Sequence, residues 1–275
     1  MKISVLMTVY NKEKPEFLKE ALESIYDNQT RKPDEIVVVF DGPLTDGLYS
    51  VLGDFKKGKE DFVFYYPQDV NRGSGEASRI GVEKCTGDYI FRMDSDDISH
   101  PQRIEKQMAY LEEHPEIDAL GTDIAEFYYS TDEKMRLRVC PEKHEDIVKM
   151  AKRRNPISHN SSCLKREALK RCGGYETMLL MEDYYLMLKI IASGGRLGNL
   201  NETLLYARIG NGFYKRRKAS VRINSFWQLQ KYMLKNKIIN VYEAITNMII
   251  IVGFTFCPLS IRKFVYDKVL RKQND

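Results

Sequence analysis

Three carboxylates stand within four residues, directly after a short apolar stretch of the sequence. Residues 89–93 have the apolar character of a buried strand, and Asp94, Asp96 and Asp97 follow it at once. Because unpaired buried charges are costly, clustered carboxylates at the end of a buried strand need a cation beside them. A hard divalent ion, which binds oxygen ligands and is shared with substrate phosphates, meets this need. The alternative is an acidic turn in which Asp97 caps the next helix.

The elements that must position these carboxylates alternate in type along the first part of the chain. The strand-like segments are Ile3–Val9, Glu35–Phe40, Phe62–Tyr66 and Tyr89–Met93. Helical spacing is found over Phe17–Ile25, from the glycine-rich turn Asn71–Gly75 through Cys85, and after Pro101, which we expect at a first helical position. This order predicts an α/β protein with an open, doubly wound, mostly parallel sheet flanked by helices.

Polar candidates follow several of these strands at the point where each one ends. Thr8, Tyr10 and Asn11 close the first strand, and Asp41 follows the second. Ligands of such sheets bind beyond the carboxyl ends of the strands. We therefore expect these loops and the Asp94–Asp97 turn, which are far apart in the sequence, to converge on one crevice.

Charge and cysteine usage describe the compartment and the partners. From residue 215 onward the chain has 13 Lys or Arg and 3 Asp or Glu, a net charge of +10, so residues 1–214 carry −6 of the total of +4. The five cysteines are scattered without a CxxC pair, which indicates reduced thiols in a cytoplasm, and no zinc site is expected. The chain opens directly on a strand-like segment, so we expect no signal peptide.

Four motifs occur in the order typical of one enzyme family. They are Ser4–Asn11, Ile36–Gly42, the Asp94-Ser95-Asp96-Asp97 run and the Glu182-Asp183 pair. In these motifs the chain resembles the family 2 glycosyltransferases of the GT-A type, many of which build bacterial polysaccharides. The resemblance extends over roughly residues 1–210. It implies a GT-A catalytic domain at 1–214, with a nucleotide-binding half (1–100) and an acceptor half (101–214), and a basic helical appendage at 215–275.

The resemblance also implies the residues that bind a nucleoside-diphosphate sugar. Tyr10 would stack on the base, and Asp41 would accept a hydrogen bond from the imide N–H of uracil, unless it only forms the turn before Gly42. Asp96 would coordinate Mn²⁺ or Mg²⁺, with Asp94 on the ribose or in the metal shell. The full implied donor set is Thr8, Tyr10, Asn11, Asp41, Asn71, Gly73, Arg79, Asp94 and Ser95. Arg79 departs from the family, which has an asparagine at its position.

On the acceptor side, Asp183 matches the catalytic base of the family. An acceptor hydroxyl that attacks the anomeric carbon must lose its proton, and one base opposite the leaving group gives inversion. Glu182 would orient the site, and His159 and Gly174 would shape the acceptor pocket. Without the other motifs, Glu182 and Asp183 are only an acidic helix start, and His159 only a polar loop residue.

The predicted function is transfer of a hexose or N-acetylhexosamine from a UDP-sugar to a glycan or a polyprenyl-diphosphate-linked glycan. A sugar nucleotidyltransferase is the alternative, although the first loop lacks the glycines of a phosphate loop. The basic tail predicts an anionic membrane surface as a partner, not nucleic acid, and a protein at the cytoplasmic face of the membrane. Its apolar segment Ile238–Cys257 could lie in the membrane interface, pack on the catalytic domain or span the bilayer, the last at the cost of burying Glu243.

Overall fold

The computed structural model describes the chain except residues 129, 132–134, 177, 210–218, 259–271 and 274–275. Within the described residues, ten strands form one sheet in the order β10-β7-β6-β8-β4-β1-β2-β3, with β9 beside β6 and β5 beside β9. The strands are β1 (Ile3–Val9), β2 (Glu35–Phe40), β3 (Val63–Pro67), β4 (Tyr89–Asp94), β5 (Ile98–Ser99), β6 (Ile117–Phe127), β7 (Arg136–Arg138), β8 (Cys163–Lys165), β9 (Arg196–Arg208) and β10 (Lys272–Gln273).

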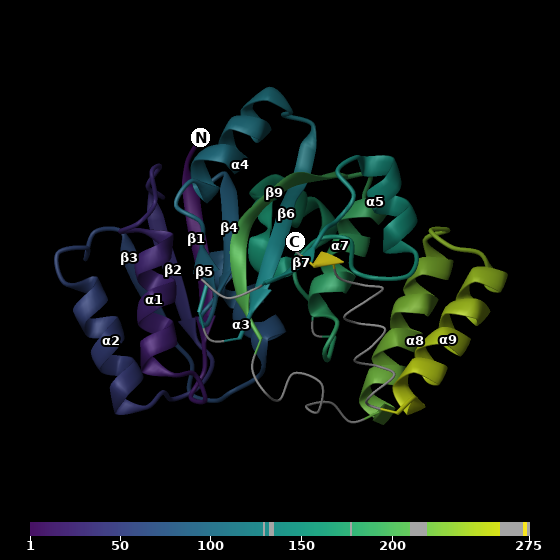
Figure 1. Ribbon diagram of the computed structural model, residues 1–275, viewed down its shortest axis with the longest axis horizontal. Helices are drawn as coiled ribbons and strands as arrows, with labels where there is room; N and C mark the ends of the chain where they lie inside the picture. Colours follow the sequence, from purple (N-terminus) through teal and green to yellow (C-terminus); the bar gives the residue numbers. More distant parts are fainter. Residues whose placement is uncertain (129, 132–134, 177, 210–218, 259–271, 274–275) are drawn as a thin grey trace.

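Helices flank this sheet and confirm the α/β fold (Figure 1). They are α1 (Pro15–Ile25), α2 (Asp46–Lys56), α3 (Ser74–Lys84), α4 (Arg103–Glu113), α5 (His144–Ala151), α6 (Arg166–Cys172), α7 (Glu182–Ala192), α8 (Ala219–Lys235) and α9 (Val241–Phe256), with a 3₁₀ turn η1 (His159–Ser161).

In residues 1–100, the part predicted to bind the nucleotide, the strands β1 to β4 pair in parallel. β1 pairs in parallel with β2 and with β4, and β2 pairs in parallel with β3. The register sets Thr8 of β1 opposite Val39 of β2 on one side and Asp94 of β4 on the other. The carboxyl ends of these strands therefore lie at the same edge of the sheet.

Two hydrophobic layers hold the sheet because successive side chains of a strand point to opposite faces. Ile3, Val5 and Met7 of β1 pack in one layer with α1, α2 and α4. Leu6 belongs to the other layer, with residues of α3, α6 and α7. Burial on both faces explains why β1 and β2 are continuous apolar runs in the sequence.

The second half of the domain departs from the sequence reading in several places. Pro101 does not start a helix, because α4 begins at Arg103 and Gln102 is its N-cap. Residues 196–208 form the single 13-residue strand β9, which runs parallel to the long strand β6 with bulges in the register. The sequence reading did not anticipate β6, α2 or α5.

The C-terminal appendage folds as a helical hairpin, α8 and α9, that packs on the catalytic body. Tyr184 and Leu188 of α7 and Ala151 of α5 form one buried cluster with Phe226 and Leu229 of α8. Three placements were considered for the apolar segment of the tail, and the structure shows one of them, packing on the catalytic body. No helix within the described residues is long and apolar enough to cross a bilayer. Much of the basic charge of the tail, including Lys215–Lys218, Arg262, Lys263 and Arg271, lies outside the described residues.

Candidate active site

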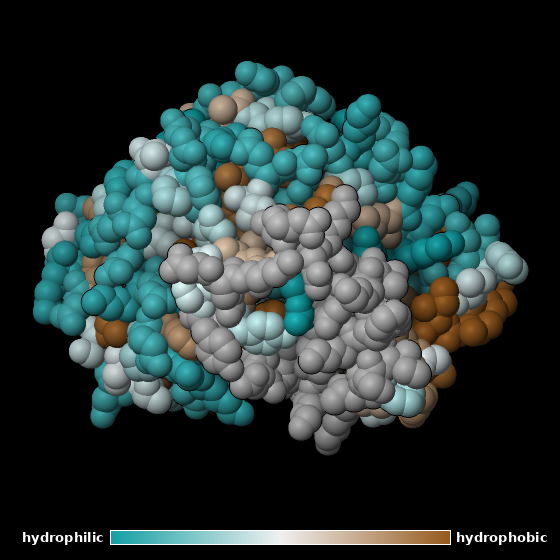
Figure 2. Space-filling model, in the orientation of Figure 1, coloured by the Kyte–Doolittle hydropathy of each residue, from teal (hydrophilic) through white to brown (hydrophobic). Residues whose placement is uncertain are grey.

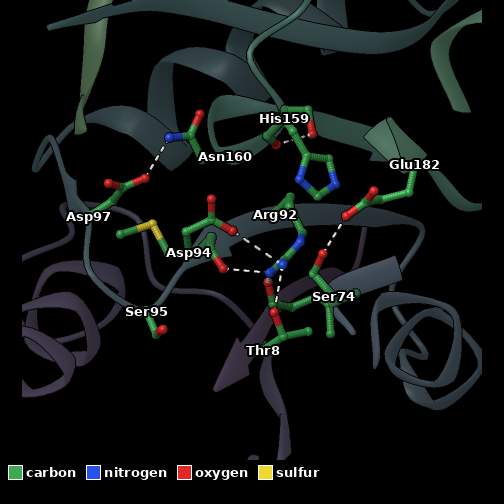
Figure 3. Close-up of polar contacts among 12 residues, drawn as sticks. Thr8, Ser74, Arg92, Asp94, Ser95, Asp97, His159, Asn160 and Glu182 are labelled. Carbon is green, nitrogen blue, oxygen red and sulfur yellow. Dashed lines mark hydrogen bonds and ion pairs between the residues drawn. The ribbon is translucent and has the colours of Figure 1, made fainter. Parts of the chain in front are cut away.

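A buried arginine organises the edge where β1 and β4 end. Arg92 of β4 is 1% exposed, and its guanidinium donates hydrogen bonds to the carbonyls of Leu6 (3.0 Å) and Met93 (2.5 Å). It also donates to Thr8 Oγ1 at 2.8 Å and lies 3.2 Å from Asp94 Oδ1 (Figure 3). One buried cation thus fixes the side chains that end two neighbouring strands. Arg92 was not predicted from the sequence, although a single arginine within an apolar strand could have indicated its role.

Asp96 lies deeper in the same turn, among other acidic groups. Burial, with the nearby charges of Glu13 and Asp94, raises the pKa of Asp96 to about 7. Ser95, which is predicted to bind the donor, donates its hydroxyl hydrogen bond to Glu13 Oε2 at 2.8 Å. Glu13 was not singled out in the sequence, although it stands in the loop after β1.

The donor set of this turn fits a divalent cation that other ligands help to hold. Asp94 and Asp96 offer hard carboxylate oxygens, and their mutual repulsion is relieved by positive charge. Across the part of the chain that the structure describes, no three His, Cys, Asp or Glu side chains are grouped to hold a metal ion by themselves. A metal here would need additional oxygen ligands from outside the protein.

Asp97 does not cap the next helix, so that alternative is wrong. It is buried, and its carboxylate accepts hydrogen bonds from Asn160 Nδ2 (2.5 Å) and from the backbone N–H of Arg208 (2.9 Å). Burial, followed by the charges of Asp96 and Asp94, holds the pKa of Asp97 well above its usual range. Asp97 therefore ties the carboxylate turn to the loop of η1 and to the end of β9.

Arg208, the last residue of β9, supports the same turn. Its Nε donates to the carbonyl of Asp96 at 3.0 Å, and its guanidinium forms an ion pair with Glu20 at 2.5 Å. The guanidinium carbon lies 3.9 Å from the ring centre of Phe17 and 4.6 Å from that of Phe127. This arginine is fixed on all these sides, and the sequence reading did not single it out.

The loop between β3 and α3 wraps around Asp41, the residue that follows β2. The carboxylate accepts hydrogen bonds from the backbone N–H of Arg72 (2.7 Å) and Gly73 (3.0 Å), and Asn71 Nδ2 donates to the Asp41 carbonyl (3.1 Å). Gly73 adopts φ of 93°, a conformation that favours glycine. The Asp41 carboxylate thus joins the loop after β2 to the loop after β3, and its contact with a base stays a prediction.

Asp183 and Glu182 open α7 on the acceptor side. Asn155 Nδ2 donates to Asp183 Oδ2 at 2.9 Å. Glu182 accepts a hydrogen bond from Ser74 Oγ at the start of α3, so α7 and α3 are joined across the crevice (Figure 3). Neither Asn155 nor Ser74 was predicted from the sequence.

His159 lies at the start of η1, next to Tyr175. Its Nε2 is 2.7 Å from Tyr175 Oη. Burial, with the nearby charge of Arg92, lowers the pKa of His159 to about 4, although Asp94 and Asp183 act in the opposite direction. The ring is therefore neutral near pH 7.

The structure also gives the surroundings of four further residues that were predicted to belong to the site. Arg79 forms ion pairs with Glu76 and Glu83 of its own helix, at 2.8 and 2.5 Å, so its guanidinium is already paired. Tyr10 is half-buried and Asn11 exposed in the turn after β1. Gly174 has φ of 63°, and its carbonyl accepts a hydrogen bond from Lys189 Nζ at 2.9 Å, consistent with a backbone role in its turn.

The sheet, the carboxylate turn and the acidic start of α7 define a GT-A type glycosyltransferase. The chain belongs to glycosyl transferase family 2, whose pattern it matches over residues 4–173. This membership sets aside the nucleotidyltransferase alternative.

Relatives from several bacteria align along nearly the whole chain. An uncharacterized glycosyltransferase of Haemophilus influenzae is 39% identical over 99% of this chain and 100% of its own length. The amylovoran biosynthesis glycosyltransferase AmsE of Erwinia amylovora is 35% identical, covering 96% of this chain and 98% of AmsE. The UDP-Gal:alpha-D-GlcNAc-diphosphoundecaprenol beta-1,3-galactosyltransferase of Escherichia coli is 32% identical, covering 98% and 97%.

Solved structures share the fold at lower identity. S. aureus TarS, residues 1–349, in complex with UDP-GlcNAc, superposes with a TM-score of 0.69 at 18% identity and covers 97% of this chain and 75% of its own. The mannosyltransferase PcManGT of Pyrobaculum calidifontis, in complex with GDP-Man and Mn²⁺, gives a TM-score of 0.60 at 18% identity, covering 96% and 78%.

Proposed function

We propose that this protein transfers a hexose or N-acetylhexosamine from a UDP-sugar, with inversion, to a hydroxyl of a lipid-linked glycan in polysaccharide synthesis. The observation that carries the proposal is the arrangement around His159. Figure 3 shows Asp94, on the strand edge held by Arg92, and Glu182, which precedes Asp183 at the start of α7, on two sides of this ring. A donor on one side and an acceptor hydroxyl on the other would meet between them.

The donor would lie across the ends of β1, β2 and β4. Thr8 and Tyr10 would contact the nucleoside, and the wrapped turn of Asp41, Asn71 and Gly73 would form its floor. UDP is the favoured nucleotide because TarS is known with UDP-GlcNAc and the Escherichia coli relative is named for UDP-Gal. The choice of sugar depends on a few hydrogen bonds to individual hydroxyls.

Asp96 and Asp94 would hold a divalent ion, Mn²⁺ or Mg²⁺, which neutralises the charge of the departing diphosphate when it is bound. The carbonyl contact of Arg208 and the buried carboxylate of Asp97 keep the turn in place without taking part in chemistry. PcManGT is known with Mn²⁺, which supports this assignment.

Asp183 would act as the base. Its Oδ2 accepts the hydrogen bond from Asn155, which leaves Oδ1 to accept the proton of the acceptor hydroxyl. Because one carboxylate acts opposite the leaving group, the reaction would be a single displacement. Glu182 is held by Ser74 and would orient the start of α7, and His159 and Gly174 would line the acceptor pocket.

The acceptor would be a glycan on a polyprenyl diphosphate carrier, as in the name of the Escherichia coli relative. Such a substrate resides in a membrane, and the basic tail at 215–275 would bring the protein to the anionic cytoplasmic leaflet. In this arrangement residues 1–100 bind the nucleotide, residues 101–214 bind the acceptor and residues 215–275 dock the enzyme.

The test is release of UDP by the purified protein in Mn²⁺ with a panel of nucleotide sugars. We expect release from one UDP-sugar, loss of this release in Asp96→Ala, and loss of transfer with retained UDP binding in Asp183→Asn. Transfer to a polyprenyl-diphosphate-linked glycan would then be followed for the active donor. Full transfer activity in Asp183→Asn would refute the assignment of the base.

A further inference from the structure

Helix α9 presents many of its apolar side chains to solvent. Ile245 is 55% exposed, Ile249 68% and Phe256 71%. Val241, Tyr242, Ile250 and Val252 of the same helix are exposed as well. The spacing from Tyr242 through Ile245, Ile249 and Val252 to Phe256 places these five side chains on one stripe of the helix. This stripe is called the outer face of α9.

The inner face of α9 holds polar groups, which fix the orientation of the helix. Asn247 is buried, and its Nδ2 donates to the carbonyl of Lys152 (2.8 Å) and to Gln230 Oε1 (3.0 Å). Glu243 forms an ion pair with Lys152 Nζ at 2.8 Å, and Ala244 joins the buried cluster beneath. Rotating α9 to bury its isoleucines would break these contacts, so the outer face stays apolar and exposed.

The apolar surface continues from α9 onto α8. Trp227 of α8 is 43% exposed, and it lines a groove of about 620 Å³ with Ile223, Met248 and Phe256. Figure 2 shows the resulting hydrophobic surface at the right edge of the molecule, over α8 and α9. Contiguous apolar surface of this kind indicates a binding partner.

The charge around this surface favours a lipid bilayer over a protein partner. Lys231, Lys235 and Lys237, in and just after α8, are exposed. Glu243 is the only acidic residue between positions 219 and 258, and it is paired on the inner face. An apolar stripe bordered by lysines, without exposed carboxylates, complements anionic headgroups above acyl chains.

We propose that the outer face of α9, together with Trp227, inserts into the interface of an anionic bilayer and anchors the protein there. Tyr242, Ile245, Ile249, Val252 and Phe256 enter the acyl boundary, and the lysines of α8 contact the headgroups. Binding therefore depends on apolar insertion as well as on charge. This inference deepens the proposed function, on which it rests for the location of the acceptor.

The position of this face relative to the crevice fits such an anchor. Figure 1 shows the start of α8 and the end of α9 at the lower edge of the molecule, the edge at which β1 and β2 also end. The outer face therefore extends from this edge, where Thr8 and Asp94 lie at the ends of their strands, to the start of α9, which follows Lys235 and Lys237 in the chain.

The experiment is flotation of the full-length protein with vesicles of phosphatidylcholine and 30% phosphatidylglycerol. The bound fraction is measured at about 0.15 M salt and again at about 1 M salt. We expect the wild type to float at both salt concentrations, with a reduced bound fraction at high salt. The double variant Ile245→Ser/Ile249→Ser should bind at least tenfold more weakly, because each isoleucine contributes about 1.5 kcal/mol or more on burial. Leu179→Ser removes an equally exposed apolar side chain (64%) elsewhere and should float as the wild type does.

Three results would overturn the proposal. They are equal flotation of the double variant and the wild type, absence of flotation of the wild type, and a wild-type dimer in analytical ultracentrifugation that the double variant loses, since the face would then be covered by a second copy. An unchanged thermal melt shows that the double variant is folded. UDP release without vesicles is measured in parallel and should be the same in both proteins. Flotation that depends on the two isoleucines, with no UDP release from either protein, would support the docking face and count against the proposed function.

Discussion

Asn155 donates a hydrogen bond from Nδ2 to Oδ2 of Asp183, at 2.9 Å. Asn155 is itself fixed, since its carbonyl accepts a hydrogen bond from Arg138 at 2.9 Å and its Oδ1 accepts one from the backbone N–H of Ile157 at 3.4 Å. Asp183 therefore meets a partner whose position is set by the acceptor half of the domain. One carboxylate oxygen is oriented by this contact, and in the proposed function the other accepts the proton of the acceptor hydroxyl.

Replacing Asn155 by alanine should slow transfer without weakening donor binding. The side chain of Asp183 would lose its orientation, and a misplaced base costs rate because proton transfer requires hydrogen-bond geometry. We expect kcat to fall about tenfold or more, with the KM for the UDP-sugar unchanged. The measurement is steady-state transfer together with UDP affinity by calorimetry. The transfer rate of Asp183→Asn is the lower limit with which the rate of Asn155→Ala is compared. A rise in the KM for the UDP-sugar alone would contradict a positioning role.

Arg208 should control how well the carboxylate turn binds its metal. Arg208→Gln removes the Nε contact to the Asp96 carbonyl, whereas the backbone contact to Asp97 is retained. Loss of one hydrogen bond of about 1 kcal/mol predicts an approximately fivefold rise in the Mn²⁺ concentration needed for half-maximal UDP binding.

Arg79→Gln is the matched control, because it also removes a guanidinium. The structure pairs Arg79 with Glu76 and Glu83 on α3, so its loss should change the Mn²⁺ requirement less than about twofold. A larger effect for Arg79 than for Arg208 would restore the donor-binding role that the sequence predicted for Arg79. Both variants are measured by Mn²⁺ titration of UDP binding, with Asp96→Ala as the variant that loses metal-dependent binding.

The strands β1 to β4 could be predicted from the sequence because they belong to a sheet that is buried on both faces. β1 and β2 begin and end where their apolar runs do, and parallel pairing then brings their carboxyl ends together. The convergence of Thr8, Asp41 and Asp94 follows from that topology alone.

Residues 101–214 were harder to predict from the sequence. Their strands carry buried polar groups whose hydrogen-bond and ion-pair partners are distant in the sequence. In β6, Asp118 pairs with Arg171 and Asp123 accepts a hydrogen bond from the backbone of Cys140. Such a strand has no apolar run and no simple alternation. Asn155 and Arg208 were missed for the same reason, since their partners are 28 and 112 residues away in the sequence.

The pH dependence of stability should include a contribution from Glu35, at the start of β2. Burial alone would raise the pKa of this carboxyl, but hydrogen bonds from Ser4 Oγ (2.5 Å) and from the backbone (2.5 Å) and hydroxyl (2.8 Å) of Thr86 outweigh it, and the pKa lies below 4.5. A carboxyl whose pKa is lower in the folded state stabilises the fold above its unfolded pKa. This contribution is lost as the pH falls through the folded value.

Glu35→Gln should therefore lower the free energy of unfolding at pH 7, by about 1–3 kcal/mol, because a charged acceptor of several hydrogen bonds is lost. The difference from the wild type should shrink as the pH falls from the ordinary pKa of a glutamate towards the lower pKa of folded Glu35, because the wild-type carboxyl is protonated below that value. Urea unfolding at pH 7 and at pH values below 4.5 measures both quantities. A difference that stays constant with pH would show that the side chain contributes by packing alone.

Two helical glycines offer a matched test of how tightly α3 packs on the sheet. A Cβ at Gly81 of α3 would lie 2.2 Å from Leu6 Cδ1 and 3.1 Å from Val39 Cγ2, whereas one at Gly53 of α2 would have no neighbour within 4 Å. Leu6 is fully buried and has no room to move, so Gly81→Ala should destabilise the protein by about 1–3 kcal/mol. Gly53→Ala should stabilise it by about 0.5–1 kcal/mol, since alanine loses less backbone entropy in a helix. Opposite shifts in the urea midpoint are expected. A stabilising effect of Gly81→Ala would mean that α3 can move away from β1, and with it Ser74, which joins this helix to Glu182 across the crevice.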